Sequence, residues 1–256
     1  MVTAGPWGLG ANRRCRSRID REDLVRERRR PLNLHGRSRT CRRRGREWRP
    51  GSILSMRVLV LGGTGFVGGW IVGELLHAGH DVEVVHRGTT EPSHSHGVPH
   101  IHLPREQVAE AWTTPRKLAF DALVDVAPYS LTDARLVLRE VPPDLRLVAL
   151  SSMDVYKASG VLRGGGGGEA VPMDEQAAIR EERFIYRDDE DPDDDYEKLD
   201  VESEYLSQGA TILRLPMVYG EGDPQRREEF VLRRCRAKRR QIPIGGGSFL
   251  WSRGHG

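Results

Sequence analysis

The apolar positions predict a strand, a turn and a helix in close succession from Met56 onward. Arg57–Leu61 (RVLVL) is a short run of branched apolar residues, which is typical of a strand buried on both faces of a parallel sheet. A helix is expected over about Phe66–Ala78, and Gly79 marks its end. A second strand, Asp81–Val85 (DVEVV), follows directly. This order predicts a parallel strand–helix–strand unit.

Later apolar runs predict further strands of the same sheet. The segment FDALVDVA (120–127) fits a fourth strand, RLVAL (146–150) a fifth, and ILRLPMVYG (212–220) a sixth strand with the turn after it. One helix is expected to begin near Tyr196, and a very basic helix over about Glu228–Arg240 is expected to present a solvated face. The predicted fold class is α/β, a doubly wound parallel Rossmann sheet.

A glycine-rich turn joins the first strand to the first helix. In Gly62-Gly63-Thr64-Gly65-Phe66-Val67-Gly68, the glycines at 62, 65 and 68 allow a tight turn, a pyrophosphate against bare backbone, and close packing of the helix on the strand. The amides that open the helix point toward such a phosphate. The alternative is a turn without a ligand. The predicted dinucleotide site consists of Gly62, Thr64, Gly65, Phe66, Val67 and Gly68.

The end of the second strand bears on the choice between NAD and NADP. NAD-binding domains place an acidic residue there, which accepts hydrogen bonds from the ribose 2′-hydroxyl. This chain has His86-Arg87-Gly88 instead, and the Arg87 guanidinium can pair with a 2′-phosphate. The cofactor is therefore expected to be NADP or NAD, with NADP favoured. The alternative is that Arg87 only flanks the adenine.

The net charge of +3 is the sum of two opposite parts. Residues 1–55 carry 16 Arg and five acidic residues, whereas residues 56–256 carry 24 basic and 32 acidic residues. The Arg-rich leader, 1–55, is expected to be disordered because it has too little apolar surface to bury. Three interpretations stay open: a wrongly assigned start upstream of Met56, a nucleic-acid-binding arm, and a targeting segment. The folded domain is predicted over 56–256.

Cysteine usage and hydropathy exclude several classes of protein. Cys15, Cys41 and Cys235 lie far apart without metal-ligand spacing, so neither a disulfide framework nor a metal site is expected, and a reducing cytoplasm is favoured. No run approaches 18 apolar residues, so no membrane span is expected. Apart from the basic leader, nucleic acid is not an expected partner, and the alternative that the basic helix near Glu228–Arg240 is a phosphate or nucleic-acid patch stays open.

Five segments together resemble a known family. They are GGTGFVG, FDALVDVAPYS (120–130), RLVALSSMDVY (146–156), YEKLDVESEYL (196–206) and TILRLPMVYGEGDP (211–224). In order and spacing they are similar to the NAD-dependent epimerase/dehydratase group of the extended short-chain dehydrogenase/reductase superfamily. The resemblance covers about Met56 to Trp251.

The resemblance implies roles for several residues. Ala127, at the end of the fourth strand, would lie beside the cofactor, and Ser152 would be the catalytic serine that hydrogen-bonds the substrate oxygen. Lys198 would hold the nicotinamide ribose and assist catalysis. Two alternatives stay open: Ser152 merely caps a strand end, or Lys198 is a surface lysine paired with Glu202.

The chain departs from the family's Tyr-x-x-x-Lys pair. Four residues before Lys198 stands Asp194, and the nearest tyrosine, Tyr196, is only two residues away and would project elsewhere on a regular helix. One interpretation is that Tyr196 lies in a distorted first turn and still serves as the catalytic acid. A second is that another loop tyrosine, such as Tyr186, serves. The third is that proton transfer is weakened or lost.

The resemblance implies hydride transfer on a carbinol or carbonyl substrate, with a nucleotide sugar as one candidate. Many nucleotide-sugar members carry Asn where this chain has Met217, and the chain stops at Gly256, so a C-terminal substrate lobe is expected to be largely absent. The irregular stretch 159–195 is expected to lie over a site. The alternatives are a non-catalytic NADP-binding regulator, an RNA-binding module, or an inactive fragment. A small-molecule substrate and a homodimer are the expected partners.

Overall fold

We describe a computed structural model in which residues 55–89, 97–108, 110, 120–139, 141–163, 169, 172–188, 195–242 and 253–255 are placed. The chain divides into two units, Met1–Gly51 and Ser52–Gly256, and all the described residues belong to the second. The predicted leader, 1–55, lies outside the described residues except for Ser55. The predicted disorder of this segment stays a prediction.

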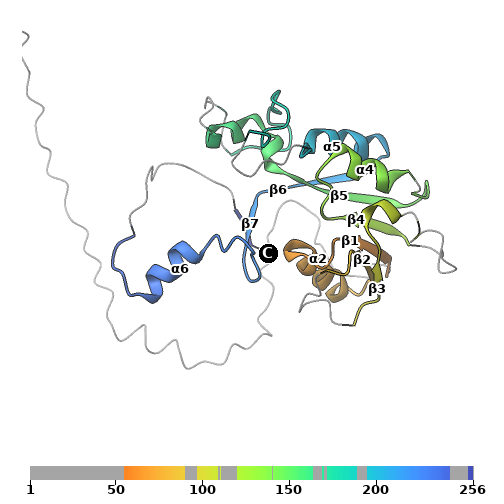
Figure 1. Cartoon of the computed structure of the whole chain (residues 1–256), viewed down its shortest axis with the longest axis horizontal. Coiled ribbons are helices and arrows are strands. Elements are labelled where there is room, and N and C mark those ends of the chain that lie inside the picture. Colours follow the sequence, from red (N-terminus) through yellow and green to blue (C-terminus); the bar gives the residue numbers. More distant parts are fainter. Residues whose placement is uncertain are drawn as a thin grey trace, which may run out of the picture. The chain divides into compact units, whose positions relative to one another are not determined.

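Six parallel strands form the main sheet, in the order β3-β2-β1-β4-β5-β6 (Figure 1). Their bounds are β1 Arg57–Leu61, β2 Asp81–His86, β3 His100–His102, β4 Ala122–Asp125, β5 Arg146–Ser152 and β6 Thr211–Leu215. The order reverses direction between β1 and β4, which is the arrangement of a doubly wound Rossmann sheet. The predicted fold class is confirmed.

Among the described residues, four α-helices and three short 3-10 helices accompany the strands. The α-helices are α2 Phe66–His77, α4 Leu131–Leu138, α5 Lys198–Ser207 and α6 Glu229–Arg236, and the 3-10 helices are η2 Arg105–Gln107, η3 Met153–Val155 and η4 Lys157–Arg163. A capping box begins α4, because Ser130 Oγ accepts from the Asp133 amide and the Asp133 carboxylate accepts in return. In the described part of the chain, no helix is long and apolar enough to cross a membrane.

The sheet buries a separate apolar cluster on each face. Leu59 and Leu61 of β1 pack with residues of α4 and α5, whereas Val58 and Val60 pack with Val72 of α2. This division follows from the strand geometry, because successive side chains point to opposite faces. Helices therefore cover both faces (Figure 1), as the unbroken apolar run of β1 predicts.

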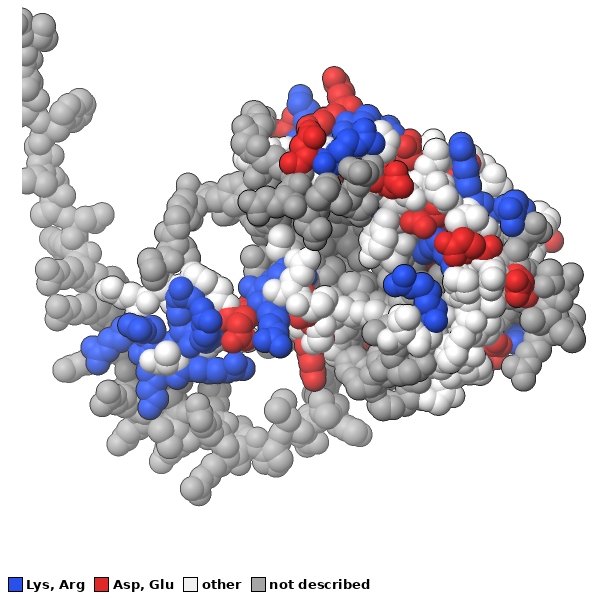
Figure 2. Space-filling view, viewed as in Figure 1, with Lys and Arg blue, Asp and Glu red and all other residues white. Residues whose placement is uncertain are grey.

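The segment predicted as one sixth strand is two strands in different sheets. The main sheet ends with β6 at Leu215, and after Pro216 the strand β7, Met217–Tyr219, pairs in parallel with β8, Arg253–His255. Proline has no amide hydrogen to donate to a neighbouring strand, so a sheet is readily interrupted there. The predicted basic helix is α6, shorter at both ends than expected, and Figure 2 shows Lys and Arg gathered on it.

Candidate functional site

The glycine-rich turn leaves β1 at the carboxyl edge of the sheet and enters α2. Gly62 adopts a left-handed conformation with φ of +79°, and its amide donates to the Val85 carbonyl at 2.9 Å. The Gly65 amide donates back to the Gly62 carbonyl at 3.2 Å. A side chain at position 62 would be strained in this conformation, so the tight turn depends on this glycine.

The other glycines of the turn have different roles. A Cβ atom added at Gly68 would lie 2.1 Å from the Gly62 carbonyl oxygen, and one at Gly63 would lie 2.9 Å from Val84. These two glycines allow the helix and the neighbouring strand to approach the turn. A Cβ at Gly65 would meet only the Gly62 carbonyl, at 3.6 Å, so the backbone there faces open space. That open backbone is where the sequence analysis expects a pyrophosphate.

Helix α2 begins at this open backbone. Gly65 is its N-cap residue and supplies no side-chain hydrogen bond to the first turn, and no acidic residue lies in that turn. The amides of a first helical turn need partners from outside the helix, and the helix dipole favours an anion there. Thr64, Phe66 and Val67 are half-buried around the same point. The predicted phosphate-binding residues therefore lie together at one helix start.

The end of β4 lies against the glycine turn. A Cβ atom added at Gly62 would lie 3.8 Å from the Cβ of Ala127, which places the predicted cofactor contact Ala127 beside the turn. Arg105 donates to the Ala127 carbonyl at 2.9 Å and forms a bidentate ion pair with Asp125 at 2.6 and 2.9 Å. Tyr205 of α5 donates to the same carboxylate at 2.6 Å. This network, which the sequence analysis did not identify, fixes the backbone at Ala127.

No carboxylate follows β2 at the position where NAD-binding domains place one. His86 is the last residue of β2 and is buried, whereas Arg87 is exposed directly after it. Of the two acidic residues of β2, Asp81 begins the strand, and Glu83 is buried and paired with Arg57 at 3.0 Å. Arg87 is thus the charged group at the end of this strand, as the sequence analysis expected.

Lys198 is buried between the ends of β4 and β5. Its ammonium group donates to the carbonyl oxygens of Pro128, at 2.7 Å, and Leu150, at 3.2 Å, and only 5% of the residue is exposed. Burial lowers the pKa of Lys198 to about 8, against the opposing charges of Asp125 and Asp154. A lysine in this setting sits at the carboxyl ends of the strands, where ligands of such sheets bind.

The alternative that Lys198 is a surface lysine paired with Glu202 is wrong. Glu202 accepts from Arg214 of β6 at 2.7 and 2.9 Å and from the Ser151 hydroxyl at 2.6 Å. The i,i+4 spacing brings the two side chains to one helix face, but tertiary partners on β5 and β6 take the carboxylate instead.

Tyr196 precedes helix α5 rather than lying within it. The helix begins at Lys198, and Glu197 is its N-cap, with its carboxylate accepting from the Leu199 amide at 3.0 Å. The rule for side chains two residues apart on a helix does not apply to Tyr196, whose ring centroid lies 5.7 Å from the Lys198 ammonium. Asp194 lies outside the described residues.

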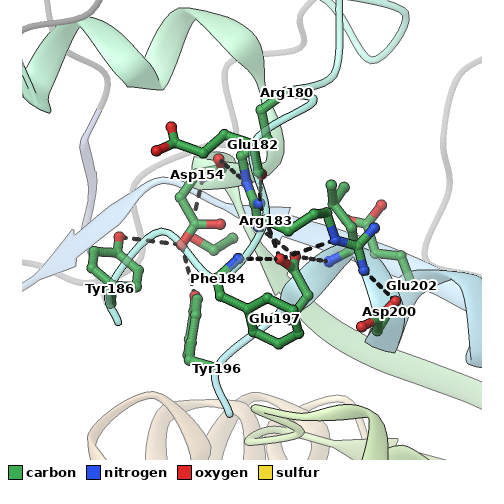
Figure 3. A network of polar contacts seen from close by, with 12 residues as sticks. Asp154, Arg180, Glu182, Arg183, Phe184, Tyr186, Tyr196, Glu197, Asp200 and Glu202 are labelled. Carbon is green, nitrogen blue, oxygen red and sulfur yellow. Dashed lines mark hydrogen bonds and ion pairs between the residues drawn. The ribbon is translucent and has the colours of Figure 1, made fainter. Parts of the chain in front are cut away.

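Two tyrosine hydroxyls meet at one carboxylate (Figure 3). Tyr196 donates to Asp154 at 2.7 Å, and Tyr186 donates to the same oxygen at 3.3 Å. Burial and the neighbouring Asp154 carboxylate raise the pKa of Tyr196 above its ordinary value, whereas a hydrogen bond with Ser152 opposes that change. The other Asp154 oxygen is buried without a hydrogen-bond partner among the described residues. The sequence analysis did not identify Asp154.

Ser152 ends β5 at the centre of this group. Its hydroxyl oxygen accepts from the Asp154 amide at 3.2 Å, so it caps the 3-10 helix η3, and its side chain also reaches the Tyr196 phenol. Ser152 therefore has a capping role, and this role is compatible with its predicted place in the site. The structure brings Ser152 into contact with Tyr196, whose ring centroid lies 5.7 Å from the Lys198 ammonium, and a shared catalytic role for the three residues stays a prediction.

The irregular segment 172–188 packs against the site and contacts Asp154 and Glu197. Arg180 is 6% exposed and forms an ion pair of 2.5 Å with Glu197, and it also donates to the Asp154 carbonyl at 3.1 Å (Figure 3). Burial alone would raise the pKa of Glu197, but hydrogen bonds from Arg180 and two backbone amides hold it below its ordinary value. The described part of the stretch 159–195 therefore contacts the site. The Gly164–Gly168 run and residues 189–194 lie outside the described residues.

Comparison with known proteins agrees with this fold and edge of the sheet. A family model for the NAD dependent epimerase/dehydratase family matches residues 58–134, which include the glycine turn and β1 to β4. The resemblance found in the sequence to this family is confirmed by the match over this segment. No curated protein matches the chain.

Several solved structures share the fold. A dTDP-glucose 4,6-dehydratase from Bacillus anthracis str. Ames, in complex with NAD, matches with a TM-score of 0.57 at 16% identity over 78% of this chain and 68% of its own. An NAD-dependent NDP-hexosamine 5,6-dehydratase, TunA, from tunicamycin biosynthesis matches with a TM-score of 0.54 at 18% identity, over 78% of this chain and 68% of its own. A UDP-glucose 4-epimerase with UDP-glucose from Thermotoga maritima matches with a TM-score of 0.53 at 16% identity, over 78% of this chain and 69% of its own. At these identities the likeness establishes the fold.

Proposed function

We propose that the protein is an NAD(P)-dependent enzyme of the epimerase/dehydratase type that transfers a hydride to or from a carbinol or carbonyl carbon. One observation carries the proposal. Lys198, Ser152 and Tyr196 converge at the carboxyl ends of β4 and β5, next to a glycine turn that leaves an open anion site. In open α/β sheets this edge is where ligands bind.

Each proposed cofactor contact follows from this geometry. The backbone of Gly62, Gly65 and Gly68, with the amides at Phe66 and Val67, would hold the pyrophosphate, and Ala127 would flank the bound dinucleotide. Thr64 is the polar side chain of the turn. When bound, the nicotinamide ring accepts or supplies the hydride, and the nucleotide-sugar enzymes of the same fold were solved with NAD or UDP-glucose.

Arg87 would decide between the two nicotinamide cofactors. Its exposed guanidinium at the end of β2 suits a 2′-phosphate, and the carboxylate that would accept from a 2′-hydroxyl is replaced by His86. We therefore propose that NADP binds more tightly than NAD.

The side chains would divide the proton chemistry. Ser152 would hydrogen-bond the substrate oxygen, and Tyr196, whose pKa is raised beside Asp154, would keep its proton at neutral pH and donate it to that oxygen. Lys198, with its pKa lowered to about 8, would contact the nicotinamide ribose and stabilise negative charge on the phenol. A nucleotide sugar is a candidate substrate, although Met217 occupies the position where many such enzymes carry Asn.

Fluorescence of NADPH and NADH titrated with the protein tests cofactor binding. Incubation with a panel of sugar nucleotides and small ketones tests turnover. Product analysis detects an epimerase or dehydratase, which returns the hydride to its product, and consumption of NADPH detects a net reductase. Binding with turnover that Tyr196→Phe removes supports the enzyme. Absence of binding to either cofactor overturns the proposal.

A second candidate is a non-catalytic dinucleotide-binding protein, which one observation favours. The Tyr196 phenol is buried and donates to a carboxylate. Burial and this contact both raise its pKa, whereas a catalytic tyrosine that must also act as a base needs a lowered pKa. Tight NADPH binding with no turnover on any substrate of the panel would support this candidate. A cytoplasmic location and a homodimer stay predictions of the sequence.

A further inference from the structure

Three histidines lie together on strands β2 and β3. His86 ends β2, and His100 and His102 are the first and last residues of β3. The parallel register pairs His86 with His102 and Val84 with His100. Residues two apart on a strand point to the same face, so all three imidazoles project from one face of the sheet.

The three rings are close enough to share one ligand. The ring centroids of His86 and His102 lie 4.6 Å apart, and those of His86 and His100 lie 4.9 Å apart. His86 Nε2 and His100 Nδ1 are separated by 2.8 Å. One ring nitrogen from each of the three residues lies within 4.8 Å of the other two.

Burial decreases across the group. His86 is 7% exposed, His100 is half-buried, and His102 is exposed. A ligand held by the three nitrogens would therefore be anchored on one side by a buried imidazole and reachable from solvent on the side of His102. Three protein ligands with one open position are the pattern of zinc sites that keep an exchangeable water.

We propose that His86, His100 and His102 form a binding site for a divalent transition-metal ion, with Zn²⁺ as the ion that the three imidazoles suit best. Imidazole nitrogens are preferred ligands of zinc, copper and nickel and poor ligands of magnesium or calcium. Zn–N bonds of about 2.0–2.1 Å in tetrahedral geometry place neighbouring nitrogens roughly 3.4 Å apart. The 2.8 Å contact is shorter than this, and all three nitrogens lie within 4.8 Å of one another, so small side-chain rotations would bring them to metal-binding distances.

The backbone at Gly88 makes the proposal specific. Its amide donates to His86 Nδ1 at 3.2 Å, so the neutral ring carries its hydrogen on Nε2 and donates it to His100. A metal at His86 Nε2 moves that hydrogen to Nδ1, which ends the contact with the amide. Gly88 also lies against His102, since a Cβ added there would approach the His102 ring at 3.5 Å. Metal binding should therefore be visible at the Gly88 amide.

The sequence contains only part of this signal. His100 and His102 stand two residues apart in HIH, but their third partner lies 14 residues before His100 on another strand. The ligand set therefore depends on the pairing of β2 with β3. The site does not rest on the proposed enzymatic function, because it requires neither the cofactor nor the substrate.

The test is zinc binding to the full chain, freed of metal with a chelator and titrated with zinc chloride by calorimetry. We expect one strong site, with affinity falling at least tenfold in His100→Ala and in His102→Ala. Two controls should retain it: His77→Ala, which removes an exposed histidine of α2, and the double variant His94→Ala/His96→Ala, which removes two histidines outside the described residues.

Three results would overturn the proposal. They are no stoichiometric binding, equal binding in His102→Ala, or loss of binding only in the His94→Ala/His96→Ala variant. Because His102 is exposed, its replacement should not unfold the protein, and circular dichroism checks this. The second measurement is the Gly88 amide resonance, which should shift on addition of zinc to the parent protein and should need at least tenfold more zinc to shift in His102→Ala. NADPH affinity, measured on the same samples, reports separately on the proposed function.

Discussion

The Tyr196 hydroxyl donates a hydrogen bond of 2.7 Å to the Asp154 carboxylate, although the two residues are 42 positions apart in the chain. A carboxylate beside a buried phenol disfavours loss of the phenolic proton, because two negative charges would then lie in contact. The Tyr196 phenol therefore stays protonated at neutral pH, at the carboxyl edge of the sheet next to Ser152 and Lys198. This property separates the site from one in which a lysine alone lowers the pKa of the tyrosine.

Tyr196→Phe should reduce turnover by about 10²–10⁴-fold, the usual contribution of a positioned proton donor. NADPH affinity should stay nearly unchanged because only a hydroxyl is lost. Steady-state kinetics and fluorescence titration measure the two quantities. Tyr186→Phe is the matched control, since its hydroxyl contacts the same carboxylate at the longer distance of 3.3 Å, and it should retain most of the activity. Equal losses in both variants would contradict the assignment of Tyr196 as the donor.

The free energy of unfolding should rise between about pH 8 and pH 10 because of Lys198. In the folded protein the pKa of Lys198 is about 8, against an ordinary value of 10.5, so within this range the unfolded chain binds the additional proton. The contribution is roughly 3 kcal/mol at most. Above pH 10 the trend should reverse, because burial raises the pKa of Tyr196 and Tyr205 and the unfolded chain then loses protons first.

Chemical denaturation at several pH values measures this profile, and Lys198→Met supplies the control. The variant lacks the titrating group, so its stability should stay flat from pH 8 to 10. It should also bind NADPH more weakly, because the ammonium group is missing from the ribose side. An unchanged pH profile in Lys198→Met would show that another group is responsible.

Gly65→Val and Gly68→Ala should damage the protein in different ways. At Gly65 the added carbon enters the open space in front of α2, so cofactor binding should be lost while the fold remains. The φ of −77° at Gly65 is available to any residue, so valine at this position does not strain the backbone. At Gly68 even a methyl group would lie 2.1 Å from the Gly62 carbonyl, so the melting temperature should fall. Calorimetric affinity and thermal unfolding of both variants separate the two effects.

Arg87→Asp should reverse a preference for NADP over NAD. The change removes the cation that suits a 2′-phosphate and supplies an acceptor for a 2′-hydroxyl. Side-by-side titrations of parent and variant with both cofactors check the outcome. Equal affinities in the parent protein would count against Arg87 as the selecting residue.

Arg105→Met should destabilise the fold by about 3–5 kcal/mol, because it leaves the buried Asp125 carboxylate without its cation. The guanidinium also holds the Ala127 carbonyl at the proposed cofactor site, so NADPH affinity should fall as well. Urea denaturation and fluorescence titration measure both effects. Arg135→Met is a suitable control, because its ion pair with Glu204 is exposed and should contribute less than about 1 kcal/mol.

The sequence by itself determined the parts of this protein that depend on near neighbours in the chain. The apolar run Arg57–Leu61, the glycine turn and the helix after it form one local unit, because strand burial, turn conformation and helix start are all set within about twenty residues. The places of the later strands β4, β5 and β6 along the chain followed from the same hydrophobic periodicity. The fold class and the glycine turn could therefore be predicted without coordinates.

Only the tertiary structure decided which side chains meet. Glu202 binds Arg214 and Ser151 instead of Lys198. Tyr196 reaches Asp154 because α5 begins at Lys198, so Tyr196 lies before the helix and the helical spacing of side chains does not apply to it. The three histidines meet because β2 and β3 pair in one register. Contacts of this kind depend on the packing of elements far apart in the chain, and hydrophobic periodicity fixes the face that an element buries without fixing its partner across the sheet.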